Sequence, residues 1–334
     1  MRIIVDAMGG DYAPDIVVKG SLLAEKEYGV DITLVGDQKR VQGLLDKAGY
    51  KGSRILVEHS EEVIEMHEPA ANSVRRKRNS SIVVGLKLVR EGKGDAFFSA
   101  GNTGAVVCAS VLTLGLLPGI ERPGIATVLP TLKGISLLID VGANIDPKPV
   151  QLLQYGIMAE SYFRYILNKP EPSIGLLNIG EEETKGNEFV KEAREMFEKS
   201  TINFIGNVEG RDIFTGKSDV IVCDGFLGNI TLKVSESLAE TLQIFLKENI
   251  MGSFLGRIGA LFLIPSFRRF KRRVDYSEYG GAPLLGVNGV VIIGHGRSNA
   301  NAIKNAIRVA KKEVEGQFNE RMLEAIKTKS RINF

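Results

Sequence analysis

The chain has 334 residues, 44% of them hydrophobic and 25% charged, so it can bury a large core without disulfides or metal staples. Its 43 lysines and arginines against 40 aspartates and glutamates leave a net charge of +3, which does not by itself indicate a nucleic-acid-binding protein. Two cysteines and three histidines, few and scattered, exclude a disulfide framework, favour the cytoplasm and make a zinc site unexpected.

The chain opens with MRIIVDAMGGD, which does not resemble a signal peptide. Short β-branched runs then alternate with helical patterns to the end of the chain. Strands are predicted at 3–5, 32–35, 55–57, 96–98, 125–128, 135–139, 174–178, 203–205, 220–222 and 290–293. Helices are predicted at 15–28, 38–48, 80–91, 103–116, 149–167, 187–199, 229–249 and 299–315. This alternation predicts an α/β fold with a mostly parallel, doubly wound sheet, in one domain over 1–334 or in two lobes.

Glycine-rich segments follow several predicted strands and lead into helices. They read DAMGGD (6–11), SAGNTGA (99–105), DVGANID (140–146), NIGEEETKG (178–186), CDGFLGN (223–229) and GHGRSN (294–299). Because the carboxyl ends of parallel strands share one edge of a sheet, we expect these segments to meet there. Glycine turns and asparagine caps explain any single segment. Six together favour an anion or acyl site at helix starts.

Several familiar motifs fail on inspection. GRDIFTGKS (210–218) resembles a P-loop, but its glycines are one residue too far apart and a strand follows it. GHGRSN lacks the third glycine of a dinucleotide fingerprint, and no GxSxG nucleophile elbow occurs. Cys108 is expected in the core. Cys223 is also expected to pack there, with a nucleophilic role left open.

Seven segments in order carry a family resemblance over essentially the whole chain: DAMGGD, SAGNTGA, LIDVGAN, NIGEEETKG, CDGFLGN, YGGAPLLGV (279–287) and GHGRS. The chain resembles the bacterial phosphate acyltransferases of phospholipid synthesis. The resemblance implies transfer of a fatty acyl group from acyl carrier protein to inorganic phosphate, giving an acyl phosphate, with no metal or cofactor. It also implies a homodimer with a three-layer α/β/α fold, similar to phosphotransacetylases and to isocitrate and isopropylmalate dehydrogenases.

That reaction needs a held phosphate, a polarised thioester carbonyl and a leaving thiolate, but no enzyme nucleophile. The glycine-rich segments supply an anion cradle. Its candidate residues are Gly9, Gly10, Gly101, Asn102, Thr103, Gly104, Asn144, Gly225 and Gly228.

Four side chains are candidates for the chemistry. Lys185 is a compact cation for phosphate or for the developing oxyanion. Asn229 could donate to the oxyanion, and Asp224 could orient a donor or take a proton from phosphate. His295 could protonate the leaving thiolate. The alternatives are a solvated lysine, a helix cap, a carboxylate at a helix start and a loop histidine.

Residues 249–274 are apolar and basic, with six lysines and arginines and no acid, which leaves 37 basic against 40 acidic residues elsewhere. The uncharged run at 258–267 is too short to span about 30 Å of hydrocarbon. We expect contact with an anionic membrane, where a glycerol-3-phosphate acyltransferase would use the product. The contact residues would be Phe254, Leu255, Leu261, Phe262, Arg268 and Arg269. A dimer-interface helix pair is the alternative.

A second basic cluster, Arg75 to Arg78, precedes a predicted helix. Acidic acyl carrier protein is a candidate partner for it, and a solvated turn is the alternative. Two other functions remain as rivals to the acyltransferase. One is a nicotinamide-dependent hydroxy-acid dehydrogenase on the related fold. The other is a non-catalytic lipid-binding scaffold docked through 249–274.

Overall fold

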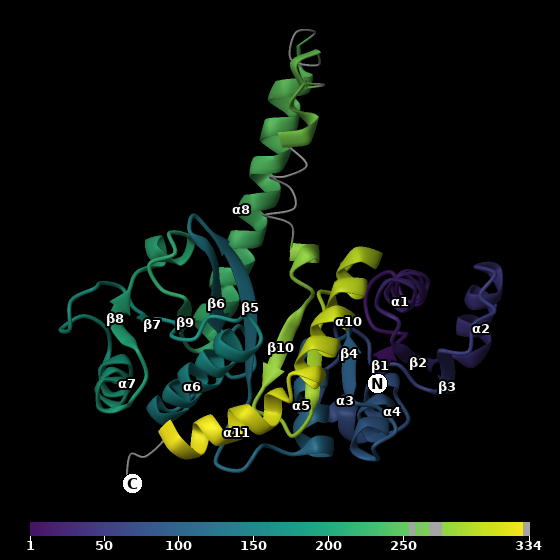
Figure 1. Ribbon diagram of the computed structural model, residues 1–334, viewed down its shortest axis with the longest axis horizontal. Coiled ribbons are helices and arrows are strands. Elements are labelled where there is room, and N and C mark those ends of the chain that lie inside the picture. The colour runs from purple at the N-terminus through teal and green to yellow at the C-terminus, as the bar shows by residue number, and fades with distance from the viewer. Residues whose placement is uncertain (254–257, 261, 267–275, 330–334) are drawn as a thin grey trace.

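The computed structural model describes residues 1–253, 258–260, 262–266 and 276–329, and its described strands form one sheet (Figure 1). Its strands lie in the order β3-β2-β1-β4-β11-β10-β5-β6-β9-β7-β8. Their bounds are β1 (Arg2–Asp6), β2 (Asp31–Gly36), β3 (Ile55–His59), β4 (Ala96–Ser99), β5 (Gly124–Thr131), β6 (Gly134–Ile139), β7 (Ile174–Leu177), β8 (Phe204–Val208), β9 (Val220–Val222), β10 (Ala282–Leu285) and β11 (Val290–Ile293).

The sheet contains two parallel halves that run in opposite directions. Strands β3, β2, β1, β4 and β11 are parallel to one another, as are β6, β9, β7 and β8. Between the halves, β10 is antiparallel to β11 and β5, and β5 is antiparallel to β6. The carboxyl ends of the two halves therefore point in opposite directions, and both lie close to the short β10. Ile293 pairs with Ala282 at its start, and Gly124, near the partner of Ile139, pairs with Leu285 at its end. The expectation that all six glycine-rich segments share one edge is wrong, because the sequence pattern did not reveal β10 or this reversal.

Helices cover both faces of the sheet. Their bounds are α1 (Asp15–Tyr28), α2 (Gln38–Lys47), α3 (Ala70–Arg76), α4 (Ser81–Arg90), α5 (Thr103–Leu114), α6 (Pro149–Tyr165), α7 (Glu188–Lys199), α8 (Gly225–Met251), α10 (Ala300–Glu315) and α11 (Phe318–Lys329), with 3-10 turns η1 (Gly210–Phe214) and η2 (Tyr276–Glu278).

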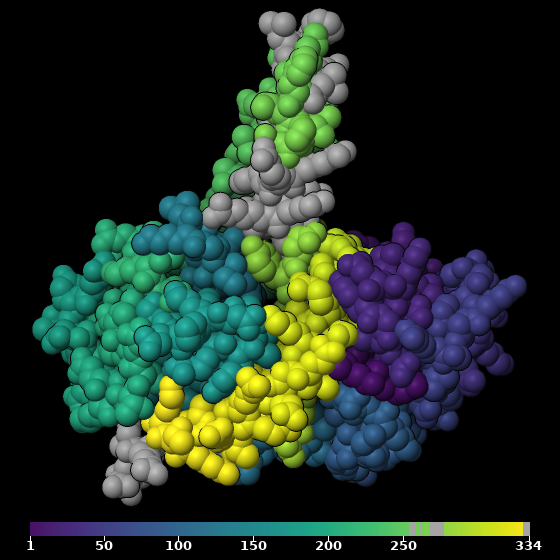
Figure 2. All heavy atoms as spheres, viewed as in Figure 1, coloured from purple at the N-terminus to yellow at the C-terminus, as the bar shows by residue number. Residues whose placement is uncertain are grey.

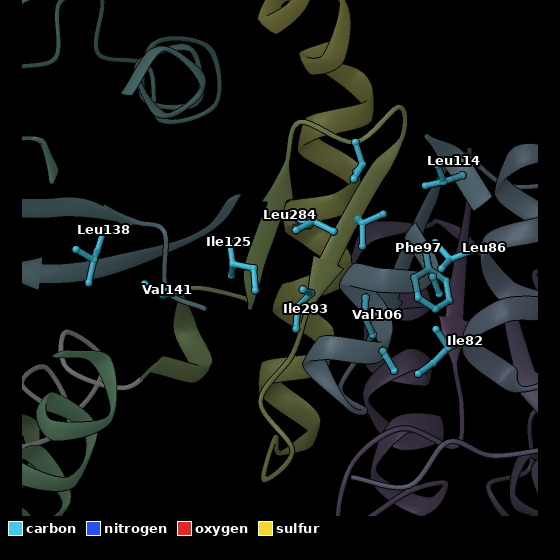
Figure 3. Close-up of a cluster of buried hydrophobic side chains, with 14 of the residues drawn as sticks. Ile82, Leu86, Phe97, Val106, Leu114, Ile125, Leu138, Val141, Leu284 and Ile293 are labelled. Atoms are coloured by element: carbon cyan, nitrogen blue, oxygen red, sulfur yellow. The ribbon is translucent and has the colours of Figure 1, made fainter. Parts of the chain in front are cut away.

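Alternating strand residues build a core on each face. Ile4 and Phe97 pack with Leu86 and Val106 of α4 and α5 on one face (Figure 3). On the other face, Ile3 and its neighbours pack with α1 and α10, while a second cluster joins the sheet to α6, α7 and α11. This alternation is what a strand buried on both faces requires. The predicted three-layer α/β/α fold is confirmed.

Helix α8 begins against the sheet and then rises out of the body as a column (Figures 1 and 2). It starts four residues earlier than predicted, because the carboxylate of Asp224 accepts a hydrogen bond from the backbone N–H of Leu227 at 2.8 Å and caps the helix. Within the described residues, no helix is both long and apolar enough to cross a bilayer.

Candidate active site

The ends of β1, β4 and β11 form the first of two polar clusters. The buried carboxylate of Asp6 accepts a hydrogen bond from Ser99 Oγ at 2.7 Å, and that hydroxyl accepts one from the N–H of Gly101 at 3.0 Å. A Cβ at Gly9 would lie 2.5 Å from the same carboxylate. Gly10 has a positive φ of 104° and lies against the carbonyl of Gly296 in the loop after β11. Glycine is therefore needed at both positions for the three chain segments to pack together.

The start of α5 opens from this first cluster. Asn102 caps α5 by accepting from the N–H of Ala105 at 3.0 Å, and its amide donates to the carbonyls of Glu65, Met66 and Glu68. These bonds fix the asparagine, so its side chain positions a loop. Thr103 and Gly104 follow it, exposed, in the first helical turn, where backbone N–H groups lack helical partners. This turn is a suitable cradle for an anion.

The ends of β6 and β9 and the start of α8 form the second cluster. The buried carboxylate of Asp140 accepts from four backbone N–H groups, including those of Gly142 and Asn144. A Cβ at Gly228 would lie 1.9 Å from the carbonyl oxygen of Asp140, and one at Gly225 would lie 2.5 Å from that of Asn144. The two glycines thus let α8 pack directly on the end of β6.

The two asparagines of this cluster have different surroundings. Asn144 has a structural role, since both N–H groups of its amide are used within the protein: one donates to the carbonyl of Pro123 at 2.6 Å and the other to the hydroxyl of Tyr155 at 2.8 Å. Asn229 is exposed, and its amide donates to the carbonyl of Val141 at 3.2 Å. An amide has a second N–H, so Asn229 can serve both the backbone and a ligand.

Lys185 lies in the loop after β7, which is separated from β6 only by β9. Its backbone carbonyl accepts from the amide of Asn178 at 3.1 Å, and its aliphatic stem passes within 2.9 Å of where a Cβ of Gly180 would be. The side chain itself is exposed. The loop thus holds the backbone of Lys185 in place and leaves its side chain exposed, at the end of a strand in the same half of the sheet as the second cluster.

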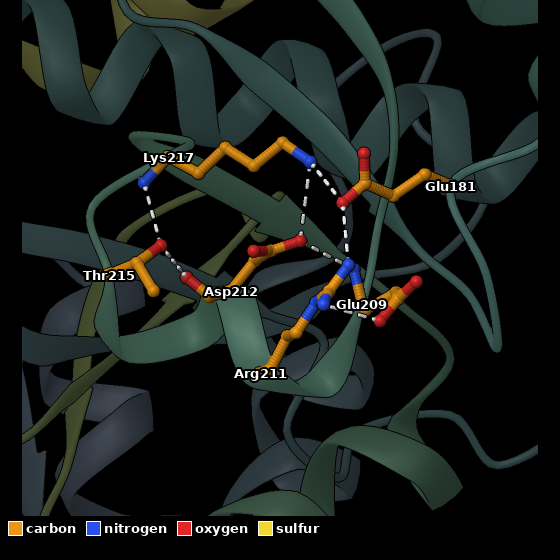
Figure 4. Close-up of polar contacts among 6 residues, drawn as sticks. All are labelled: Glu181, Glu209, Arg211, Asp212, Thr215 and Lys217. Atoms are coloured by element: carbon orange, nitrogen blue, oxygen red, sulfur yellow. Dashed lines mark hydrogen bonds and ion pairs between the residues drawn. The ribbon is translucent and has the colours of Figure 1, made fainter.

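An ion-pair network ties the same loop to GRDIFTGKS (Figure 4). Glu181 contacts Lys217 at 2.9 Å and Arg211 at 3.2 Å, and Lys217 also contacts Asp212 at 3.3 Å. The segment forms η1 and leads into β9, so the rejection of a P-loop is confirmed. The hydrogen bond and charge of Lys217 lower the pKa of Glu181. The GRDIFTGKS segment therefore helps to position the loop that carries Lys185, through the ion pairs of Arg211 and Lys217 with Glu181.

Helix α8 connects the two clusters. One turn after Asn229, Lys233 Nζ lies 3.1 Å from His295 Nε2, in the loop after β11, and 2.7 Å from Glu236 Oε2. Glu236 lies 3.8 Å from the same imidazole nitrogen, and further along, Arg297 lies 3.7 Å from Glu240. One polar face of α8 thus carries groups from the end of β6 to the end of β11. A reaction along this face of α8 can therefore use groups from both halves of the sheet.

His295 is held as a neutral imidazole. Partial burial, and then the ammonium of Lys233, lower the pKa of His295 below its ordinary value of 6.5. Its Nδ1 accepts from the backbone N–H of Arg297 at 3.1 Å. The neutral ring has one lone pair to accept a proton, so taking up a proton in the reaction requires that it replace either the Arg297 N–H at Nδ1 or the Lys233 contact at Nε2.

The sequence-predicted residues thus fall into two groups. Gly9, Gly10, Gly101, Asn102, Thr103, Gly104 and His295 gather at the end of one half, and Asn144, Lys185, Asp224, Gly225, Gly228 and Asn229 gather at the end of the other. Sequence reasoning missed Lys233. Its spacing of four from Asn229, which places both on one helix face, was the available signal.

Two further predictions concern the cysteines and metals. Cys223 is buried, as expected, and burial raises the pKa of its thiol well above the ordinary value, which disfavours a thiolate nucleophile. Cys108 is half-buried beside the core. Over the described part of the chain, no cluster of three or more metal-ligating side chains occurs.

Of the six expected membrane-contact residues, only Phe262 is described, and it is 82% exposed. Phe254, Leu255, Leu261, Arg268 and Arg269 lie outside the described residues.

Known proteins resemble this chain over nearly its full length. A family model described as fatty acid synthesis protein matches residues 1–321. The chain is 48% identical over 328 residues to the phosphate acyltransferase of Geobacter sulfurreducens, covering 98% of this chain and 95% of that protein. It is 52% identical over 321 residues to the phosphate acyltransferase of Desulfitobacterium hafniense, covering 96% of each.

Solved structures of similar fold include a phosphotransacetylase from Streptococcus pyogenes, with a TM-score of 0.67 at 17% identity over 94% of each chain. A branched-chain phosphotransacylase from Enterococcus faecalis has a TM-score of 0.56 at 14% identity, covering 94% of this chain and all of the other. These likenesses show the fold.

Proposed function

The chain belongs to the fatty acid synthesis protein family and is a phosphate acyltransferase, and we propose that its acyl donor is the thioester of acyl carrier protein and its acceptor inorganic phosphate. The product, an acyl phosphate, then enters phospholipid synthesis. The strongest structural support is the polar face of α8, which carries Asn229 and Lys233 from one glycine-lined sheet end to His295 at the other. The dehydrogenase and scaffold alternatives are not favoured.

The reaction moves one acyl group and one proton. A phosphate oxygen attacks the thioester carbonyl, the carbon–sulfur bond breaks, and the proton of the phosphate ends on the sulfur of the carrier. The start of α5 holds the dianion through its free backbone N–H groups, and Lys185, on the other half of the sheet, supplies a cation for the charge that develops on the carbonyl oxygen. Asn229 donates to the oxygen of the tetrahedral intermediate with the N–H that Val141 does not take.

His295 carries the proton from the attacking phosphate oxygen to the sulfur of the carrier. Because its pKa is lowered, the imidazole is neutral at pH 7 and can accept the proton as the P–OH oxygen attacks. The imidazolium then returns that proton to the leaving thiolate. This role differs from a simple acid, because the histidine begins and ends the cycle neutral.

A direct assay tests the proposal. The purified protein is incubated with fatty acyl-carrier thioester and phosphate, and acyl phosphate is trapped with hydroxylamine as the hydroxamate. We expect hydroxamate to form only when phosphate is present, and one free carrier thiol to be released for each hydroxamate formed. Nucleotide binding without product would instead support a dehydrogenase, and lipid binding without product would support a scaffold.

Replacing Lys233 with methionine should shift the acidic limb of the pH–rate profile. The wild-type kcat/KM should fall as pH drops below 6.5, where His295 becomes protonated. Removing the neighbouring cation, while Glu236 remains, raises the pKa of His295, so the loss should begin at a higher pH in the variant. Lys247→Met, on the same face of α8 but further out, is the matched control. If kcat/KM instead falls as the pH rises, and this alkaline limb shifts in the variant, His295 acts as an acid.

We also propose that a second copy of the chain covers α8. An apolar stripe of α8 residues, each between 38% and 61% exposed, runs along its length: Leu227, Val234, Leu238, Leu242 and Phe245. Burying such side chains is worth about 1.5–3 kcal/mol each at most. A homodimer in which two columns pack side by side accounts for this stripe.

We propose that the protein is cytoplasmic and that the segment beyond α8, called the tip, contacts the membrane surface. Phe262 and Leu263 are exposed there, and the segment is basic. Apolar residues would enter the acyl boundary while the cations meet anionic headgroups, where a glycerol-3-phosphate acyltransferase could receive the reactive product.

Two paired variants separate the dimer from the membrane contact. We expect Phe262→Glu with Leu263→Glu to abolish co-sedimentation with anionic vesicles while the protein stays dimeric and active on phosphate. Leu238→Glu with Leu242→Glu should make it monomeric in size-exclusion chromatography. If the tip variant is the monomeric one, and wild type never sediments with vesicles, the tip is a dimer element and the membrane proposal is wrong.

A further inference from the structure

A basic surface lies at the end of α3 and beside α4. Arg75, Arg76 and Arg78 are exposed there. Among the described residues, no carboxylate lies within ion-pair distance of these three guanidinium groups, whereas many other cations of the chain have such a partner. We name these three arginines the α3 patch. Three cations without an ion-pair partner in the described part of the chain make this turn locally positive, although the carboxylates of Glu62 and Glu68 line the hollow beside Arg76.

The turn that carries the α3 patch is held rigidly. Lys77, between the arginines, points inward to pair with Glu68 and donates to the carbonyl of Val63 at 2.7 Å. Hydrogen bonds led by that of Lys77 lower the pKa of Glu68 to about 2, so the pair stays charged at neutral pH. Lys87 of α4 donates to the carbonyl of Arg78 at 3.1 Å. Arg78 Nε also donates to the carbonyl of Arg75 at 3.3 Å, so this guanidinium lies along the turn, while all three arginines remain exposed on a fixed backbone.

The same segment borders the candidate active site. Asn102, at the start of α5, binds three carbonyls of the loop before α3, and a Cβ at Gly104 would lie 3.0 Å from that of Ala70. Met66 reaches Gly296, next to His295. A hollow of about 390 Å³ against α3 includes Arg76 in its lining. A partner seated on the patch would therefore lie next to both the anion cradle and the proton-carrying histidine.

We infer that the α3 patch is the docking surface for the acidic carrier protein that delivers the acyl thioester, an inference that rests on the proposed function. Charge complementarity identifies the occupant, since the patch is positive and the carrier is acidic. An anionic membrane is disfavoured, because α3 lies on the body away from the outer end of α8 (Figure 1). Carrier docking and membrane contact could then occur together.

Comparing two acyl donors tests the patch. One donor is the acyl-carrier thioester, and the other is the same acyl chain on pantetheine, which lacks the protein. We expect Arg75→Glu, Arg76→Glu and Arg78→Glu together to raise KM for the carrier donor at least about tenfold. The kcat/KM for acyl-pantetheine should stay unchanged, which also shows that the variant is folded. Added salt should raise the wild-type KM for the carrier donor only.

A matched triple variant and three outcomes decide the result. Lys39→Glu, Arg40→Glu and Lys47→Glu reverse three exposed charges on α2 and should leave both donors unaffected. An equal effect on both donors, or none on either, would overturn the inference. Loss of binding to anionic vesicles with unchanged carrier kinetics would assign the patch to lipid instead. If wild type makes no acyl phosphate from either donor, the proposed function itself fails.

Discussion

Replacing Lys185 with alanine is expected to lower kcat/KM for phosphate by about 10²- to 10³-fold, or about 3–4 kcal/mol. The side chain is exposed in the loop after β7, the neighbour of the strand β9 that leads into α8, and the reaction concentrates negative charge on phosphate and on the carbonyl oxygen. Asn178 binds the backbone carbonyl at this position, and alanine keeps that carbonyl. The loop should therefore keep its shape while the site loses one cation.

Initial rates at varied phosphate, with the thermal unfolding midpoint measured alongside, check this expectation. Lys191→Ala is the matched control, because Lys191 is a nearby lysine of α7 paired with Glu188 at 3.0 Å. Its exposed pair is worth about 0–1 kcal/mol of stability at most, and its removal should leave phosphate kinetics unchanged. Unchanged phosphate kinetics in the Lys185 variant would remove this lysine from the site.

Periodicity was sufficient to place most of the sheet. Strands β1 and β9 and helix α1 were predicted within a residue or so, because buried strands read as short β-branched runs and α1 has a clear apolar face. Strand β10 was missed because its residues, APLL, are few and follow two glycines of positive φ. That short strand, with β5, reverses the sheet, so its omission misplaced half of the glycine-rich segments.

Two helices were also missed, for different reasons. Helix α3 has seven residues, too few for a periodic signal. Helix α11 carries Phe318, Met322 and Ile326 at a spacing of four, all buried, so its signal was present in the sequence.

The chemistry of the site was predictable only in part. Asn102 and Asn229 were both recognised at helix starts. A single sequence cannot show, however, that the amide of Asn102 donates to three carbonyls while that of Asn229 donates to one and has an N–H left for a ligand. The contact between Lys233 and His295 joins residues 62 positions apart. It depends on how far α8 reaches across the sheet, which local patterns do not encode.

Of the variants considered, Gly228→Ala is expected to have the largest effect on stability and turnover. It should destabilise the protein, although helix propensity alone predicts that alanine stabilises. Alanine is favoured over glycine by about 1 kcal/mol inside a helix. Here, however, the new Cβ would lie 1.9 Å from the carbonyl oxygen of Asp140 and 2.9 Å from Cys223 Sγ. The oxygen belongs to the backbone at the end of β6, so no side-chain rotation relieves the overlap. The first turn of α8 must move away.

That movement should damage stability and turnover together. Overpacking of this kind costs about 1–3 kcal/mol or more of unfolding free energy. It would also displace Asn229 from the carbonyl of Val141 and Lys233 from His295, so turnover should fall by more than about 10²-fold. Denaturant unfolding and hydroxamate formation, measured on the same preparation, check both parts.

Gly43→Ala provides the control, because no atom lies within 4 Å of the Cβ it would add in α2. It should leave activity unchanged and raise stability by up to about 1 kcal/mol, as propensity alone requires. If Gly228→Ala behaves in the same way, α8 does not pack on β6 as closely as described, and the bridge from Asn229 to His295 would have to be abandoned. If Gly228→Ala instead unfolds while Gly43→Ala does not, the close approach of α8 to Asp140 is a condition for both the fold and the site.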